Sequence, residues 1–157
     1  MEGKKHKDNP QSFTIPTQSD DANALIRAMV NQNVAKIMTA SARAVQRAVL
    51  RGAEIATEYA PVDTGDLRAG IHADDVIVRE DCIIGTYGTN SPYGAYVEFG
   101  TGRRGAASPH GEPLEELEYK YEWDGIEAQP YMYPASLVVQ KELPKMMVQC
   151  IQEELTT

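Results

Sequence analysis

The spacing of apolar residues predicts a long helix near the start of the chain. From Ser19 or Asp20 to Tyr59, apolar side chains recur in steps of three and four, no proline interrupts the run, and alanine fills many other positions. A helix of this length extends about 60 Å, which exceeds the width of a domain of this size. We therefore expect one end to project or the helix to break near Gly52. A projecting end needs a neighbour that covers its apolar face.

A turn ends this helix and a strand hairpin follows. Pro61 disfavours the helical conformation at the residue before it, and Gly65 can adopt a positive φ that lets the chain turn. Apolar and polar residues alternate in one phase over residues 71–73 and in the opposite phase over residues 76–78, which predicts a bulge or bend between them. We expect residues 82–87 to return as the partner strand.

The second half of the chain is predicted to be mostly loop, with a helix at its end. Residues 93–99 fit a short helix, and residues 100–111 form a glycine-rich loop. Aromatic and polar residues alternate within residues 117–132, which predicts a strand or a hairpin arm. A second apolar stripe predicts a helix over residues 134–154, and Pro144 should kink it or split it in two. This order predicts an α+β fold with a small antiparallel sheet of three to four strands.

Length and periodicity indicate one domain behind an arm. The 157 residues suit a single domain that buries a real core. Residues 1–18 show almost no periodicity, so we expect a mobile N-terminal arm, with residues 19–157 forming a single α+β domain. The lysines of the arm could touch an acidic partner, although a solvated tail is the simpler interpretation.

Charge and hydropathy argue against several classes of function. A formal net charge of −8 does not favour nucleic-acid binding through phosphate neutralisation. No apolar run approaches the roughly 20 residues that a membrane span needs, and the charged N-terminus lacks the apolar core of a signal peptide. Cys82 and Cys150 show no metal-ligand spacing, so we interpret both as reduced core residues of a cytosolic product.

Candidate chemistry is sparse. His6, His72 and His110 are scattered without the paired spacing of a metal site or a catalytic base. The glycine-rich residues 100–105 lack the Lys-Ser/Thr pair of a phosphate loop. Capping or solvent exposure explains the aspartates at 63, 66, 74 and 75 more simply than an acid/base pair does. We therefore expect no enzymatic activity, no cofactor and no metal site.

Three segments resemble one family of phage proteins. Their sequences are YAPVDTGDLRAGI at residues 59–71, YGAYVEFGTG at residues 93–102 and GIEAQPYMYPA at residues 125–135. They resemble the signatures A-P-V-D-T-G-x-L-R-x-S-I, Y-A-x-Y-V-E-F-G-T-G and A-Q-P-F-M-x-P-A of the gene-ten-like tail-completion proteins of lambdoid phages. Order and spacing agree from about residue 22 to 155. Gly70 stands where the family usually has Ser, and Tyr131 where it has Phe.

The resemblance implies a non-enzymatic virion protein, made in the cytoplasm of the host bacterium, at the head–tail junction or the tail end. Such a protein assembles in several copies around the tail axis, as a ring. Its other partners are head–tail connector, tail terminator or tail tube proteins, and neither nucleic acid nor a membrane is implied. The positions that match the family's motifs are Pro61, Asp63, Thr64, Gly65, Leu67, Arg68, Tyr96, Glu98, Phe99, Gly100, Thr101, Gln129, Pro130, Met132 and Pro134.

Two structural roles follow for these positions. We expect Leu67, Tyr96 and Phe99, together with Ile71, to fix the loops to the sheet. We also expect Arg68 and Glu98 to pair, because an Arg–carboxylate fork can lock two loops together.

Two other classes of function remain open. A monomeric regulatory or inhibitory binding protein would carry one compact exposed patch and would be absent from phage particles. An enzyme would need a deep pocket that holds carboxylates with perturbed pKa values.

Overall fold

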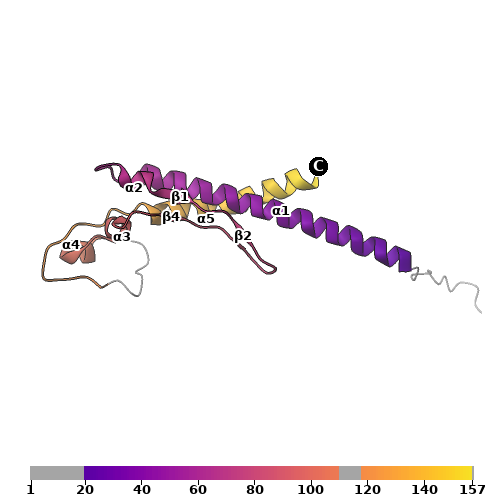
Figure 1. The fold of residues 1–157 in the computed structure, drawn as a ribbon, viewed down its shortest axis with the longest axis horizontal. Helices are drawn as coiled ribbons and strands as arrows, with labels where there is room; N and C mark the ends of the chain where they lie inside the picture. Colours follow the sequence, from indigo (N-terminus) through magenta and orange to yellow (C-terminus); the bar gives the residue numbers. More distant parts are fainter. Residues whose placement is uncertain (1–19, 110–117, 157) are drawn as a thin grey trace, which may run out of the picture. The chain divides into compact units, whose positions relative to one another are not determined.

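The structure is a computed structural model that describes residues 20–109 and 118–156. Its elements confirm the α+β class with a small antiparallel sheet (Figure 1). The predicted arm, residues 1–18, lies outside the described residues. The chain divides into two compact units, residues 1–35 and 36–157, which are described separately. The elements are, in order, α1 (Asp20–Tyr59), α2 (Asp66–Ala69), β1 (Ile71–Ala73), β2 (Ile77–Val78), β3 (Ile83–Ile84), β4 (Tyr87–Thr89), α3 (Gly94–Phe99), α4 (Gly102–Ala107) and α5 (Met132–Leu155).

Helix α1 does not break at Gly52. It is helical from Asp20 to Tyr59, as the apolar spacing predicts. Gly52 is buried, and a Cβ atom there would lie 2.6 Å from Cε1 of Tyr87. The glycine therefore serves the close approach of an aromatic ring from β4 and does not end the helix.

The core of residues 36–157 lies between α1 and α5. One cluster of buried residues combines Ile55, Ala56 and Ala60 of α1 with Leu67, Tyr131 and Ala135. A second cluster combines Ala40 and Ala44 of α1 with Cys150 of α5. The residue numbers rise along one helix as they fall along the other, so this part of α1 and α5 run antiparallel (Figure 1). Alanine dominates the contact on α1 because a small side chain lets the two backbones approach closely.

Ion pairs follow the same contact between α1 and α5. Arg43 pairs with Glu154 at 2.9 Å, Arg47 with Glu153 at 3.3 Å and Arg51 with Glu142 at 3.7 Å. All six side chains are partly exposed, so each pair contributes at most about 1 kcal/mol. The order of the pairs again follows the antiparallel arrangement.

The sheet consists of two short antiparallel ladders. β1 pairs with β4, where Ala73 lies opposite Tyr87, and β2 pairs with β3, where Val78 lies opposite Ile83. Residues 74–76, where the bulge or bend is predicted, lie between the two ladders and belong to neither strand. Cys82 is exposed in the turn between β2 and β3, whereas Cys150 is fully buried. The assignment of both cysteines to the core is therefore wrong for Cys82, because a two-residue strand pair leaves its turn in solvent.

Two predictions for the second half of the chain are wrong. Residues 102–107 of the expected glycine-rich loop are helical and form α4. Residues 118–131 form no strand, because their backbone groups bond to Thr101, to the first residues of α4 and to Val97 of α3. Helix α5 begins at Met132, two residues earlier than predicted, and continues through Pro144 as one helix. No helix among the described residues is long and apolar enough to cross a membrane.

Candidate functional site

Glu98 holds the start of α5. Its side chain lies on α3 and is 5% exposed. One carboxylate oxygen accepts the backbone N–H groups of Tyr131 at 2.7 Å and Met132 at 2.9 Å, and the other accepts that of Tyr133 at 2.9 Å. The first N–H groups of a helix have no partner within it and carry a partial positive charge. The side chain of Tyr131, the residue before α5, makes no capping hydrogen bond, so Glu98 supplies the cap from another part of the chain.

Arg68 binds the opposite kind of helix end. Its Nε donates to the carbonyl oxygen of Ala60 at 2.8 Å and its Nη2 to that of Glu58 at 3.4 Å. These carbonyls belong to the C-terminal end of α1, where the helix carries partial negative charge. The predicted pair of Arg68 with Glu98 is therefore wrong. Each charged side chain instead binds a helix end of opposite partial charge. The backbone groups at these ends have no partner within their helix, so bonding them is favoured over a direct pair of Arg68 with Glu98.

The second and third sequence blocks are joined through their backbones. Thr101 donates to the carbonyl oxygen of Ile126 at 2.9 Å, and Ile126 donates to that of Thr101 at 3.1 Å. Gln129 donates to the carbonyl oxygen of Val97 at 2.8 Å. A Cβ atom at Gly125 would lie 1.8 Å from the Thr101 oxygen, so only glycine permits this approach. These bonds replace the strand that the aromatic alternation predicts.

Tyr131 lies at the centre of the arrangement. Its side chain is 1% exposed, and a Cβ atom at Gly94 would lie 2.8 Å from its hydroxyl oxygen. Burial raises the pKa of the Tyr131 hydroxyl to about 12, with Glu98 and then Tyr93 acting in the same direction. Tyr131 therefore keeps the packing role of the family's usual Phe and adds a buried hydroxyl.

Besides a hollow of about 440 Å³ beside Glu98, Phe99 and Met132, the motif positions line two grooves on the outside of this framework. The first has a volume of about 340 Å³ and brings the Pro61–Gly65 turn together with Leu67 and Gln129, from the first and third blocks. The second has a volume of about 540 Å³ and is lined by Tyr96, residues 100–102, residues 118–120, Trp123 and Ile126. The three blocks thus converge in space as well as in sequence order.

Not every motif position is part of the packed framework. Leu67 is 4% exposed and packs in the core as expected. Tyr96 is 59% exposed, so the prediction that it fixes a loop to the sheet is wrong. It lies on the outer face of the short helix α3, whose opposite face carries Glu98. Phe99 is partly buried, and Pro134 lies in the first turn of α5.

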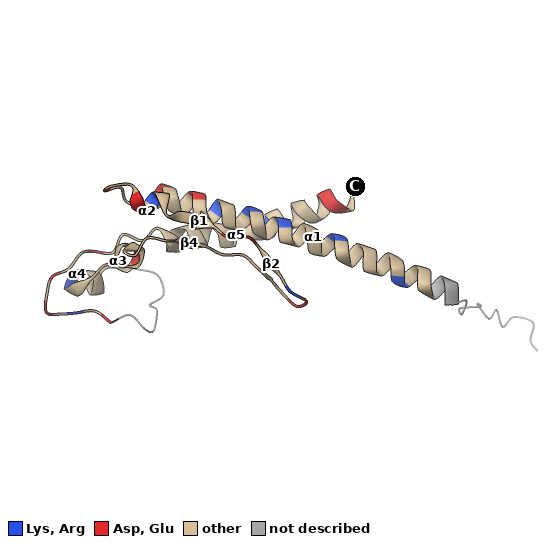
Figure 2. Cartoon of the chain, viewed as in Figure 1, with Lys and Arg blue, Asp and Glu red and all other residues tan. Residues whose placement is uncertain are grey.

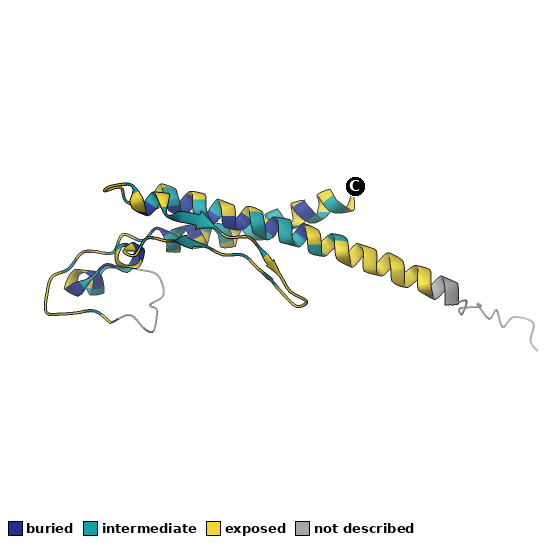
Figure 3. Cartoon of the chain, viewed as in Figure 1, coloured by how far each residue is buried: buried dark blue, intermediate teal, exposed yellow. Residues whose placement is uncertain are grey.

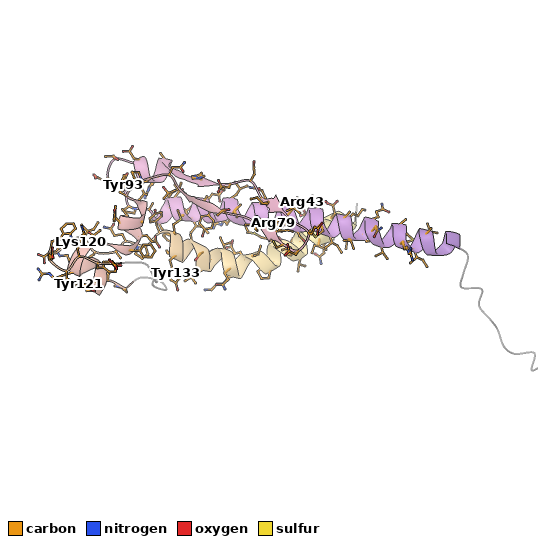
Figure 4. The ribbon with its side chains drawn as sticks, turned by 60° about the horizontal axis from the view of Figure 1, so that its bottom comes forward. Arg43, Arg79, Tyr93, Lys120, Tyr121 and Tyr133 are labelled. Carbon is orange, nitrogen blue, oxygen red and sulfur yellow. The ribbon has the colours of Figure 1, made fainter. Side chains whose placement is uncertain are left out.

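Sequence reasoning missed an exposed aromatic surface on residues 118–127. Tyr121 is 66% exposed and Trp123 is 53% exposed. Figure 4 shows Lys120 and Tyr121 in the same region of residues 36–157 as α4. The alternation of aromatic residues was a valid indication of a special surface. Period-two alternation is typical of strands, but here the aromatic side chains lie on a segment without a strand.

Charged groups in the site act on the backbone. Among residues 20–109 and 118–156, no three His, Cys, Asp or Glu side chains gather as metal ligands would. His72 of β1 follows the first block directly, with Nδ1 3.0 Å from the carbonyl oxygen of Gly70 and Nε2 3.6 Å from Asp74. What the arrangement does chemically is to hold helix ends and loops in fixed positions.

The family of the chain follows from a match to a family model. Residues 18–100, which are more than half of the chain, match the family described as "Bacteriophage HK97-gp10, putative tail-component". The chain belongs to this family of phage tail components. The match includes the first block and most of the second, with Arg68 and Glu98. Neither the curated proteins nor the solved structures contain a match.

Proposed function

We propose that this tail component completes the tail or joins it to the head, as a non-enzymatic part of the virion present in several copies around the tail axis. Its partners are then copies of itself and the connector, terminator or tube proteins next to it. The motif positions form the framework that presents its contact surfaces. In this proposal residues 19–157 act as one domain and residues 1–18 as an arm.

The observation that carries the proposal is that the two charged motif residues, Glu98 and Arg68, bind backbone groups at helix ends. Both carboxylate oxygens of Glu98 accept hydrogen bonds, from three backbone N–H groups in all, and Arg68 donates to two backbone carbonyl oxygens. A catalytic carboxylate needs a position from which it can reach a substrate proton. A residue that holds the fold together must instead bond to backbone groups of other segments, as Glu98 and Arg68 do. The motif thus supports a structural role.

A second observation supports contact with other proteins. Large apolar side chains of α1, including Leu25, Ile26 and Met29, are more than half exposed (Figure 3). Exposed apolar patches of this kind mark interaction surfaces. A protein whose function is assembly requires such surfaces.

The test is a phage or prophage from which the gene for this chain is deleted. We expect filled heads and separate tails by electron microscopy, and joined infectious particles once purified protein is added to the extract. The Glu80→Ala variant should restore joining as the unchanged protein does, because Glu80 is exposed in the turn between β2 and β3. Normal particles without the gene, or particles that never contain the chain, would contradict the proposal and favour a regulatory binding protein.

A further inference from the structure

One face of α1 combines exposed apolar side chains with positive charge. The α1 stripe consists of Leu25, Ile26, Met29, Val30 and Val34, all between 54% and 63% exposed. Their spacing places them on one side of the helix. Arg27 is the charged residue within the stripe, and Lys36 follows it along the helix. The arginines further along α1 are already paired with glutamates (Figure 2). A matching partner therefore needs apolar side chains with acidic neighbours.

The same helix already meets such a partner further along. Residues 40–51 of α1 are covered by α5, which supplies Cys150, Met146 and Met147 as apolar contacts. Around these contacts α5 supplies Glu142, Glu153 and Glu154 to the arginines of α1. This contact within one chain indicates that apolar side chains flanked by acidic ones are a suitable partner for the part of α1 before residue 36.

A second exposed surface of the chain has that chemistry. The aromatic groove is the hollow of about 540 Å³ lined by Tyr96, Trp123 and Ile126, which are 59%, 53% and 47% exposed. Residues 118–127, which form one side of it, contain four acidic residues and one basic residue, Lys120. One of the acids, Asp124, pairs with Arg103. The groove is thus open, apolar and bordered by an excess of negative charge.

We propose that the aromatic groove of one copy receives the α1 stripe of the next copy. Residues such as Met29 and Val30 insert between Tyr96, Trp123 and Ile126, as amphipathic helices do in apolar grooves. Arg27 faces the acids of residues 118–127.

The contact joins two different surfaces, so it can repeat from copy to copy. Such a head-to-tail contact closes into a ring when the rotation between copies allows it. The inference rests on the proposed function, since it names the surfaces through which the copies around the tail axis meet.

Two proteins, each with one exposed cysteine besides the buried Cys150, test the contact. Both carry Cys82→Ser, which removes the exposed thiol, and one adds Val30→Cys while the other adds Tyr121→Cys. Mixed in equal amounts and mildly oxidised, at high protein concentration and in particles assembled from both, they should form a mixed disulfide dimer several-fold above a matched control. In the control the second protein carries Glu80→Cys, on the exposed turn after β2. A yield above the control reports a contact between the two chains, because random collisions cross-link the control protein as well.

Charge reversal provides the second arm of the test. Arg27→Glu on the Val30→Cys protein, or Glu122→Arg on the Tyr121→Cys protein, should lower the dimer yield about two- to tenfold. Both reversals together should restore it. A yield equal to the control in solution and in particles would overturn the proposed contact, while particles with several copies would leave the proposed function intact. Absence of the chain from particles would overturn the proposed function itself, whatever the cross-linking result.

Discussion

Glu98 and Tyr131 are 33 residues apart in the chain, yet a carboxylate oxygen of Glu98 accepts the backbone N–H of Tyr131 at 2.7 Å. Both residues are buried, at 5% and 1% exposed. This bond and its two neighbours fix where α5 begins. Because α5 then packs along α1, one carboxylate connects the second and third sequence blocks to the core.

Removal of the Glu98 carboxylate should destabilise the protein strongly. Glu98→Ala leaves three backbone N–H groups without their acceptor. That of Tyr131 is buried, where the loss costs about 1–3 kcal/mol. Those of Met132 and Tyr133 are part-buried and can bond to water instead, at a smaller cost. We expect a total loss of about 2–4 kcal/mol in the free energy of unfolding, measured by urea denaturation. Glu98→Gln keeps one acceptor oxygen and should recover part of the loss. The exposed control Glu80→Ala should stay within about 0.5 kcal/mol of the unchanged protein, and a similar result for Glu98→Ala would refute the capping role.

Arg68 and Glu98 should act independently. They bind different helix ends and share no partner. Arg68→Ala should cost about 1 kcal/mol, since Arg68 is partly exposed and makes two hydrogen bonds to backbone oxygens. In a double-mutant cycle, the effects of Arg68→Ala and Glu98→Ala should add to within about 0.5 kcal/mol. A coupling energy well above that value would reinstate a direct pair between the two side chains.

Two glycines with positive φ should tolerate alanine differently. Gly65 has a φ of 91° and open space around its missing side chain, so Gly65→Ala should cost about 1–2 kcal/mol from backbone strain alone. Gly100 has a φ of 71°, and a Cβ there would lie 2.6 Å from the backbone nitrogen of Ala128. Gly100→Ala must therefore also displace backbone, and its loss should exceed that of Gly65→Ala. Thermal melting of the two variants compares them, and equal melting temperatures would contradict the structure.

The buried hydroxyl of Tyr131 should make the protein sensitive to alkali. Its pKa is raised from 10.0 in the unfolded chain to about 12 in the folded protein. Between these values the unfolded state loses the proton first, so the stabilisation is complete below about pH 10 and is lost as the pH rises through the folded pKa. We expect Tyr131→Phe to reduce the fall in the free energy of unfolding as the pH rises from 10 to about 12. Identical pH profiles for the unchanged protein and Tyr131→Phe would contradict this prediction. The control is Tyr121→Phe, since the Tyr121 side chain is exposed and its removal should leave the profile unchanged.

The predictions from sequence succeeded where the cause is local. The α1 helix and its stripe follow from a spacing of three and four residues, which any helix must obey. The interruption between β1 and β2 follows from a change of phase, and the positive φ of Gly65 follows from a Pro-x-Asp-Thr-Gly turn. Errors arose for residues 118–131, where local alternation favoured a strand. The backbone of the loop at Thr101 supplied other hydrogen-bond partners.

The sequence by itself thus determined the helices, the positions of the turns and the family resemblance, because periodicity, proline and glycine act within a few residues. Only the tertiary structure decided that Arg68 caps α1, that Glu98 caps α5 and that Tyr96 faces solvent. These outcomes depend on which backbone groups lack partners once the segments have packed. These hydrogen bonds form between residues far apart in the chain, and the spacing of side chains along the sequence does not predict such partners.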